Sequence, residues 1–537
     1  MFDFKGLISA LLRKNDDNPV GDLKSATIWV QELPQHDIHQ ALKEIIKALG
    51  DLNKSEDTAL KERIRVILYL DEKARSLQNT LCRDYLAVIN DVTAQERQYL
   101  PSIQMFWEEM AAGYQNCIRT YAKNPGGKIR EQMPLVTAKA IHFQAMQAKW
   151  KLIHYLPVDA NIWRRLHRLY NFAEQEKIER VPVSLYSKQE ETSCTSEYLQ
   201  PMMLHLANPA SLLPDQIEMI DFWLDSWAKS LVIESEFRPQ RQIYAVNLGD
   251  TKPARKLRRN MLGEHYRYWG FELLQVHISK IIDQLKQGEV PARLKLGEAC
   301  RLPACMDLIE EVSLRWAGKV TTRKHERIQA EKTLLVTESL ADIIKLLKGG
   351  KPAASSAATY RIETRRSSDM AAPTISGEPD LFQTGAQQWQ VENESLSGYG
   401  VTFDRSGPGE QLRIGTLVAL KPPMGQGGLC IGIVRRIQNA PPRTVNAGIQ
   451  TLSQTPVLVE LHPLAGEGGK ARYAIYLPEL ARMNQGRSLL IHSQMYSAGR
   501  MIRLLAQGKD YTIRLQTAVE QHSDYVRTGF DVVAKHA

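Results

Sequence analysis

The 537-residue sequence has no long hydrophobic run near its start and few cysteines, and each shortage excludes a class of protein. The strongly apolar residues 66–70 are far fewer than the roughly 18 residues that a membrane-spanning helix needs. The N-terminal segment offers no small-residue cleavage site typical of a signal peptide. Six scattered cysteines are too few for a disulfide framework, although Cys300 and Cys305 lie close in the sequence. We therefore expect a soluble, cytoplasmic protein in a reducing compartment, with no membrane insertion.

The sequence also lacks the motifs of the common enzyme classes. It contains no GxxxxGK[ST] phosphate loop, no HExxH metal motif, no GxSxG nucleophile elbow and no GxGxxG loop after a strand. No nucleophile, base or metal-binding constellation is evident. We therefore expect no catalytic residues, no metal site and no cofactor, which indicates a protein that is not an enzyme.

Charge is distributed unevenly along the chain. The net charge is +9, from 69 lysines and arginines against 60 aspartates and glutamates. Residues 311–537 hold 28 basic and 20 acidic side chains and carry +8, whereas residues 1–310 carry +1. The stretch 411–450 holds five basic residues and no acidic ones. This asymmetry predicts that the C-terminal part binds a small anion and that the N-terminal part has another role.

The pattern of apolar residues divides the chain into a helical part and a β-rich part. In residues 37–50 they recur at the spacing of one buried helix face, with Asp37 placed to cap the start and Gly50 to end it. After Trp316, short alternating segments bounded by turn residues predict a small antiparallel barrel. The expected fold class is multidomain α + β, with an N-terminal all-α helical bundle or stack, then a C-terminal antiparallel β-barrel with a β-rich extension.

Four segments follow from this division: a tail, a helical domain, a barrel and an extension. Within the barrel, a stretch rich in Ala, Ser, Gly and Pro has no sustained period, which indicates a disordered insertion. The extension either continues the barrel or forms a second small β-domain. The expected bounds are 1–21 for the tail, 22–317 for the helical domain, 318–465 for the barrel with its insertion at about 349–388, and 466–537 for the extension.

A basic segment in the helical part offers one candidate binding surface. Residues 252–259 read KPARKLRR and are followed by Tyr266, Tyr268 and Trp269. Basic side chains beside aromatic ones bind single-stranded nucleic acid through phosphate contacts and stacking. Here the aromatic residues fall at helical spacing, so we expect them in the core and the charges in water. A nucleic-acid-binding protein that uses 252–259 is therefore an alternative, and nucleic acid is not the expected partner.

Two motifs in the β-rich part carry a more specific signal. Residues 323–327 read RKHER and precede the expected strand 333–337, and residues 393–398 read NESLSG in a later strand. An RxxxR followed by [D/N]xSxxG in this order resembles the PilZ domain, a bacterial receptor for cyclic di-GMP. The later segments LCIGIVRRIQN and NAGIQTLS resemble further strands of that family. The resemblance covers roughly residues 318–465.

The resemblance implies a set of ligand contacts. A guanidinium group can bind guanine O6 and N7 or a phosphate with two hydrogen bonds, and it can stack on a base. An asparagine amide can meet a guanine edge, a serine can bind guanine or phosphate, and a glycine allows close approach. Matched residue by residue, the contacts are Arg323, Arg327, Asn393, Ser395 and Gly398, with Arg435 as a weaker candidate.

A second RxxxR lies in the expected insertion, from Arg361 to Arg365. Its distance to Asn393 is the commoner spacing in the family. The residues after Arg365 alternate poorly, however, whereas Arg327 leads directly into a good strand. The pair in 323–327 is therefore preferred, and Arg361 and Arg365 are the alternative.

The sequence thus predicts a signalling effector whose ligand is cyclic di-GMP. The ligand would order the RxxxR junction and change the arrangement of helical domain and barrel. This change would control an unidentified protein partner through the helical domain. Because some relatives of the PilZ domain have lost the ligand residues and bind proteins only, a ligand-free protein-interaction scaffold is a further alternative.

Overall fold

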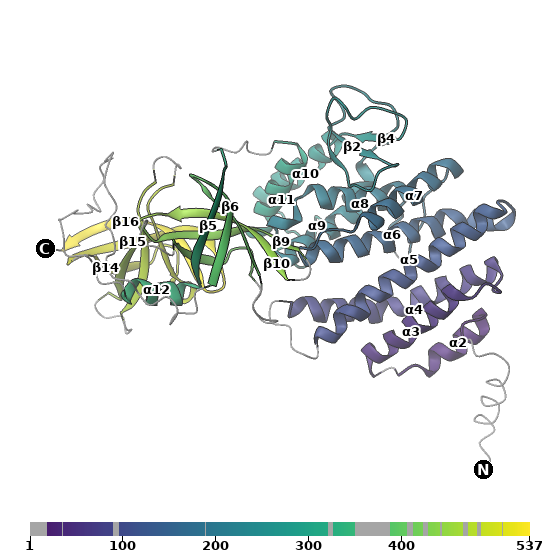
Figure 1. Ribbon diagram of the computed structural model, residues 1–537, viewed down its shortest axis with the longest axis horizontal. Helices are drawn as coiled ribbons and strands as arrows, with labels where there is room; N and C mark the ends of the chain where they lie inside the picture. The colour runs from purple at the N-terminus through teal and green to yellow at the C-terminus, as the bar shows by residue number, and fades with distance from the viewer. Residues whose placement is uncertain are drawn as a thin grey trace, which may run out of the picture. The chain divides into compact units, whose positions relative to one another are not determined.

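The chain divides into two compact units, Met1–Thr321 and Thr322–Ala537, which are described separately (Figure 1). The first unit is mainly helical and the second contains two closed β-barrels, which confirms the expected multidomain α + β fold class. The computed structural model describes residues 19–34, 36–89, 96–187, 189–319, 326–349, 387–404, 412–422, 428–440, 443–464, 471–480, 485–506 and 508–536. Within these ranges, no helix is both long enough and apolar enough to cross a membrane.

The helical unit is built around α6, a helix that is buried on nearly all sides. It contacts α5, α7, α8 and α9, and together these helices form one continuous apolar core. The helices are α2 (Leu23–Glu32), α3 (Ile38–Lys54), α4 (Leu60–Ala87), α5 (Tyr99–Lys123), α6 (Met133–Ile153), α7 (Ala160–Glu176), α8 (Cys194–Leu206), α9 (Pro214–Trp227), α10 (Glu272–Lys286) and α11 (Ala304–Trp316).

The two ends of α3 test the expectations for residues 37–50. Asp37 caps the start, because its side chain accepts a hydrogen bond from the backbone N–H of Gln40. The expected end at Gly50 is wrong, since the helix continues to Lys54. Leu52 is fully buried beyond the glycine, and its burial outweighs the cost of about 1 kcal/mol that glycine adds within a helix.

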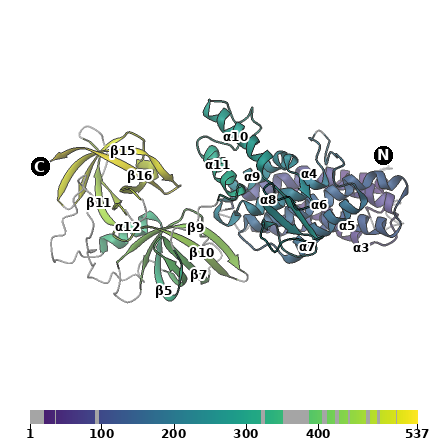
Figure 2. The ribbon, with the colours of Figure 1, turned by 90° about the horizontal axis from the view of Figure 1, so that it is seen from above.

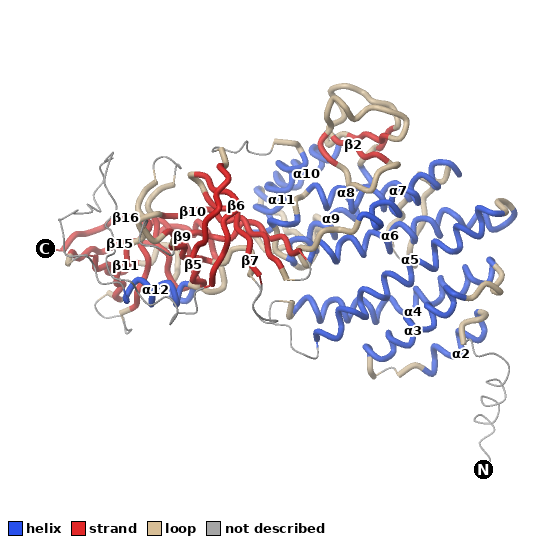
Figure 3. Tube along the Cα trace, viewed as in Figure 1, coloured by secondary structure: helices blue, strands red, loops and turns tan. Residues whose placement is uncertain are grey.

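A small sheet interrupts the helical unit, so the expectation of an all-α domain is corrected (Figure 3). Its strands, in the order β1-β4-β2-β3, are β1 (Ile233–Glu234), β2 (Tyr244–Asn247), β3 (Arg255–Lys256) and β4 (Tyr266–Trp269). The aromatic residues after 252–259 therefore lie on a strand and not on a helix. Trp269 pairs with Ile233 on one side and with Tyr244 on the other, and these long-range pairings override the helical spacing.

The first barrel of the second unit closes in the order β10-β7-β6-β5-β8-β9, with neighbouring strands antiparallel. Trp389 stacks on Phe403 inside it, with ring centroids 4.2 Å apart. The strands are β5 (Ile328–Glu338), β6 (Gln387–Ser395), β7 (Gly398–Asp404), β8 (Leu417–Lys421), β9 (Cys430–Ala440) and β10 (Thr444–Ser453). Nearly all of the expected insertion, 350–386, lies outside the described residues.

The C-terminal extension forms a second closed barrel, which decides between the two alternatives left open above. Its strands, in the order β11-β12-β13-β16-β15-β14, are β11 (Val457–His462), β12 (Arg472–Leu477), β13 (Ser488–His492), β14 (Met501–Ala506), β15 (Lys509–Gln521) and β16 (Tyr525–His536). The expected boundary between 465 and 466 is corrected, because β11 pairs with β12 and β14 of the second barrel. The second barrel therefore starts at Val457.

The two barrels share an apolar core around the helix α12 (Leu340–Gly349) (Figure 2). This helix contacts β5 and β8 of the first barrel and β11, β12 and β13 of the second. Ile343 of α12 is fully buried in the same cluster as Ile433 of the first barrel and Leu490 of the second. The core of the second unit is therefore continuous across both barrels.

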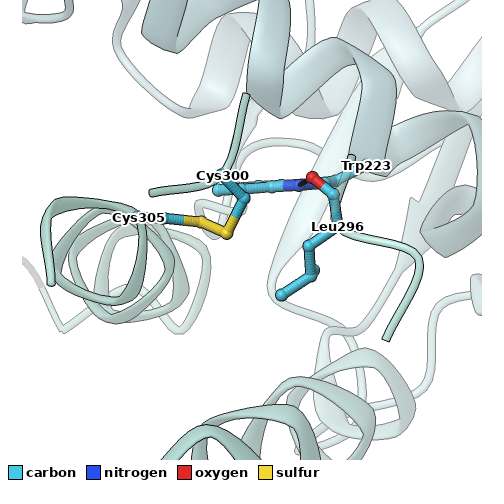
Figure 4. The surroundings of a disulfide bond; sticks show 4 residues. All are labelled: Trp223, Leu296, Cys300 and Cys305. Atoms are coloured by element: carbon cyan, nitrogen blue, oxygen red, sulfur yellow. Dashed lines mark hydrogen bonds between the residues drawn. A yellow bond between two sulfur atoms is a disulfide. The ribbon is translucent and has the colours of Figure 1, made fainter. Parts of the chain in front are cut away.

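Cys300 and Cys305 form a disulfide bond just before and at the start of α11 (Figure 4). Beside it, Nε1 of Trp223 donates a hydrogen bond to the carbonyl oxygen of Leu296, 3.0 Å away. The two cysteines lie five residues apart, and the bond was not predicted from the sequence. The short segment between the two cysteines turns back on itself and brings their Cα atoms to 5.1 Å, within the range that a disulfide spans.

Candidate functional site

The NESLSG motif forms the hairpin between β6 and β7. Ser395 pairs with Gly398, so Leu396 and Ser397 make a two-residue turn. The hydroxyl group of Ser395 donates to the carbonyl oxygen of Gly398 at 3.3 Å and lies 3.2 Å from the hydroxyl of Ser397. Since Asn393 lies two residues before Ser395 on the same strand, the two side chains share one face of the sheet.

That face is the outer surface of the barrel. On β7, Val401 and Phe403 are buried in the interior, and Gly400 alternates with them. A Cβ atom at Gly400 would lie 2.7 Å from Nδ2 and from Oδ1 of Asn393, so the amide covers this glycine. The absence of a side chain at Gly400 leaves the space that the Asn393 amide occupies.

A row of four paired residues crosses the outer surface. Asn393 on β6 pairs with Gly400 on β7, Gly400 pairs with Gly448 on β10, and Gly448 pairs with Arg436 on β9. A Cβ atom at Gly448 would lie 3.3 Å from Cβ of Arg436, which places both on the same face. An amide and a guanidinium group thus flank two glycines over three strand spacings, roughly 14 Å. We call this row the glycine row.

Asn393 has unused hydrogen-bonding capacity. Its Oδ1 atom is buried and has no hydrogen-bond partner among the described residues. A buried polar atom without a partner costs roughly 1–3 kcal/mol, and such atoms are uncommon in folded proteins. An acceptor of this kind beside two glycines is suited to a donor group of a bound ligand.

Arg327 lies directly before β5, next to the end of β6. The first residue of β5, Ile328, pairs with Glu394, and Gln329 pairs with Asn393. The backbone register therefore brings the exposed Arg327 beside the hairpin that holds Ser395. Its expected partner Arg323 lies outside the described residues, as do Arg361 and Arg365, so the choice between the two RxxxR segments stays a prediction.

Arg435, the weaker candidate, has partners in both barrels. Its Nε atom donates to Oε1 of Gln450 at 2.7 Å, and its guanidinium group forms an ion pair with Glu520 of β15. Gln450 in turn pairs with Gly398 of the motif. The structure therefore connects Arg435 to the motif through one intervening residue.

A charged group at the end of β6 was missed by sequence reasoning. Lys332 forms an ion pair with Glu394, and its Nζ atom lies 5.6 Å from the centre of the Tyr399 ring. Burial raises the pKa of Tyr399 to about 12. The glycine row was also missed, because Gly448 and Arg436 join it only through the pairing of distant strands.

The basic segment 252–259 forms a separate surface on the helical unit. Arg255 and Lys256 are exposed on the edge strand β3, and the backbone of Lys252 accepts a hydrogen bond from Nε2 of His167 on α7. Tyr268 and Trp269 are buried, which leaves their rings inaccessible for stacking on bases. Within the described parts of the chain, no group of three or more His, Cys, Asp or Glu residues is arranged to hold a metal ion.

Two family models match the chain, and together they span more than half of it. The model described as "Cyclic-di-GMP receptor FimW, N-terminal domain" matches residues 24–240, and "FimW C-terminal beta-barrel domain" matches residues 457–533. The chain is similar to the FimW family over these two segments. The FimW C-terminal match coincides with the second barrel, which starts at Val457. The barrel that carries the NESLSG motif lies between the two matched segments.

A curated relative within this family is the cyclic-di-GMP receptor FimW of Pseudomonas aeruginosa. It is 22% identical over 335 residues, which are 61% of this chain and 54% of the relative. The chain thus spans about half the length of the curated relative it matches. The expected relationship to cyclic di-GMP receptors is confirmed at the level of the FimW family.

Proposed function

We propose that the chain is a signalling effector that binds cyclic di-GMP on the outer face of its first barrel. The observation that carries this proposal is the glycine row, in which Asn393 and Arg436 flank two residues without side chains, Gly400 and Gly448. The name of the Pseudomonas aeruginosa relative supports the same ligand.

The chemistry of the ligand matches the groups around this row. Cyclic di-GMP presents two phosphates and two guanine bases, and the absence of a side chain at Gly448 lets a base or ribose approach the backbone closely. If the Asn393 amide turns outward, its unpartnered oxygen accepts from a guanine N–H group, and Ser395 binds guanine or phosphate. Guanidinium groups before β5, at Arg327 and Arg323, bind a phosphate or the O6 and N7 edge of guanine.

The position of the RxxxR segment suggests how binding reaches the helical unit. Residues 323–327 lie where the chain passes from the helical unit to the barrels, since the boundary falls after Thr321. A ligand that gathers this segment onto the hairpin would restrict the connection between the units. The helical unit would then act on a protein partner, and no chemical turnover is involved.

Isothermal titration of the full chain with cyclic di-GMP tests the ligand. We expect Asn393→Ala to weaken binding at least about tenfold, which corresponds to the loss of roughly 1.4 kcal/mol. Gln390→Ala is the matched control, because Gln390 is an exposed amide on the same strand beyond the β-bulge. No binding by the wild-type chain at high micromolar ligand, or equal binding by the two variants, would contradict the proposal.

The same titration distinguishes the two RxxxR segments. We expect Arg323→Ala/Arg327→Ala to abolish binding and Arg361→Ala/Arg365→Ala to retain it. The opposite pattern would show that Arg361 and Arg365 bind the ligand. The proposed function would then stand with this other pair of arginines.

A further inference from the structure

Glu520 of the second barrel forms an ion pair with Arg435, which lies close to the proposed ligand face. Arg435 reaches Gln450, the neighbour of Gly398, with its Nε atom and Glu520 with its Nη2 atom. The side chain of Arg435 is 39% exposed, so a ligand in solution can reach it. Arg435 therefore contacts both Gln450 of the first barrel and Glu520 of the second.

The carboxylate of Glu520 lies between two arginines. Besides the ion pair with Arg435, its Oε1 atom is 4.0 Å from the guanidinium group of Arg527 on β16. Its Oε2 atom is buried and has no hydrogen-bond partner among the described residues. Arg527 is nearly buried, and its Nε atom donates to the hydroxyl of Ser488 at 3.2 Å. Arg527 is thus held beside Glu520 independently of Arg435.

Carboxylates and phosphates bind a guanidinium group through the same pair of N–H donors. A phosphate that arrives next to Gly398 therefore meets Arg435 while its Nε faces Gln450 and its Nη2 faces Glu520. If Arg435 turns to the phosphate, Glu520 keeps a cationic neighbour in Arg527. The cost of breaking the pair is then lower than for a buried carboxylate left without any cation.

We propose that Glu520 competes with a phosphate of the ligand for Arg435, so that binding of cyclic di-GMP breaks the Arg435–Glu520 pair and loosens the contact between β9 and β15. The inference rests on the proposed function and adds a regulatory step to the same site. Because coupling is reciprocal, any partner that strengthens the contact between the barrels weakens ligand binding.

Glu520→Gln tests this competition, because it removes the charge and keeps the volume. We expect the variant to bind cyclic di-GMP about fivefold more tightly, as for the removal of a part-exposed competing ion pair. The matched control is Asp510→Asn, since Asp510 lies on the same strand but pairs with Arg503 of its own barrel. We expect the control to bind as the wild type does.

Hydrogen exchange of the wild-type chain gives a second readout that needs no variant. We expect saturating cyclic di-GMP to speed amide exchange at the end of β15, around Glu520, and to leave the end around Asp510 unchanged. Unchanged or weaker binding by Glu520→Gln, or unchanged exchange around Glu520, would overturn the inference while the proposed function stands. A wild-type chain that does not bind cyclic di-GMP would overturn both.

Discussion

The hydroxyl group of Tyr525 donates a hydrogen bond to the carbonyl oxygen of Gly415, 2.9 Å away, and so joins the second barrel to the first. The ring of Tyr525 is fully buried in the core that the barrels share. His522 packs against this ring with centroids 4.8 Å apart. A Cβ atom at Gly415 would lie 2.2 Å from Cε1 of His522, so the close contact depends on a glycine, whose φ of +88° also favours glycine.

Tyr525→Phe should weaken this contact between the two barrels. The substitution leaves the carbonyl of Gly415 without this donor in a buried place, and we expect the free energy of unfolding to fall by about 1–2 kcal/mol. Urea denaturation of the full chain measures the change. Tyr496→Phe is the control, because the Tyr496 hydroxyl donates to the carbonyl of Gln516 at an exposed site where water can replace it. Equal losses in the two variants would contradict the prediction.

Gly398→Ala should destabilise the first barrel whether or not a ligand is present. A Cβ atom there would lie 1.9 Å from the carbonyl oxygen of Ile449 on β10, and overpacking of this kind costs roughly 1–3 kcal/mol. Thermal unfolding without ligand measures it, with Gly486→Ala as the control because no atom lies within 4 Å of a Cβ at Gly486. A stable Gly398→Ala variant that has lost only ligand binding would show that the glycine serves the ligand alone.

Thiol titration of the unfolded chain should detect the disulfide bond. We expect four reactive thiols before reduction, from Cys82, Cys117, Cys194 and Cys430, and six afterwards. Because the closed loop is short, we expect its removal by Cys300→Ser/Cys305→Ser to lower the free energy of unfolding by at most about 2 kcal/mol. Cys82→Ser is the control for the loss of a thiol. Six thiols before reduction would contradict the bond.

The helical unit should lose stability as the pH falls below the ordinary pKa of histidine. Burial lowers the pKa of His154, His167 and His205 below the usual 6.5. The unfolded chain then takes up protons that the folded chain excludes, so stability is fully present above pH 6.5 and decreases below it. Urea midpoints of the helical signal between about pH 7.5 and about pH 5.5 measure this decrease.

The variant His205→Leu should flatten this pH dependence. Nδ1 of His205 is buried without a hydrogen-bond partner among the described residues, so leucine removes a titrating group without breaking a bond at that atom. His36→Gln, at an exposed histidine, is the control and should leave the slope unchanged. Identical slopes in the wild type and His205→Leu would show that His205 does not contribute to the loss.

The helices could be predicted where burial repeats at a helical period. The apolar residues in 37–50 recur at that period, and they lie in α3 at Ile38–Lys54. The strands β1 and β3, by contrast, are two residues long and have no period of their own. They exist because β2 and β4 offer free edges, and edge pairing is a long-range interaction that a local pattern does not contain.

The motif residues of the candidate site could be predicted from the sequence, but the surface that they form with residues of other strands could not. The NESLSG motif gives the positions of Asn393 and Ser395 directly. The glycine row, however, requires that Gly400, Gly448 and Arg436 come into register from three separate strands. Arg435 was assigned as a ligand contact from the sequence alone, and its pairing with Glu520 depends on how the second barrel folds back on the first.

The helix α12 determines how much of the chain a domain transplant must carry. A fragment that ended at Ser453 would include the whole motif-bearing barrel, yet Ile343 and Ile433 would lose the neighbours that Leu490 and Tyr525 supply. Apolar side chains newly exposed to water make such a fragment prone to aggregate. A domain transplant must therefore carry the two barrels together.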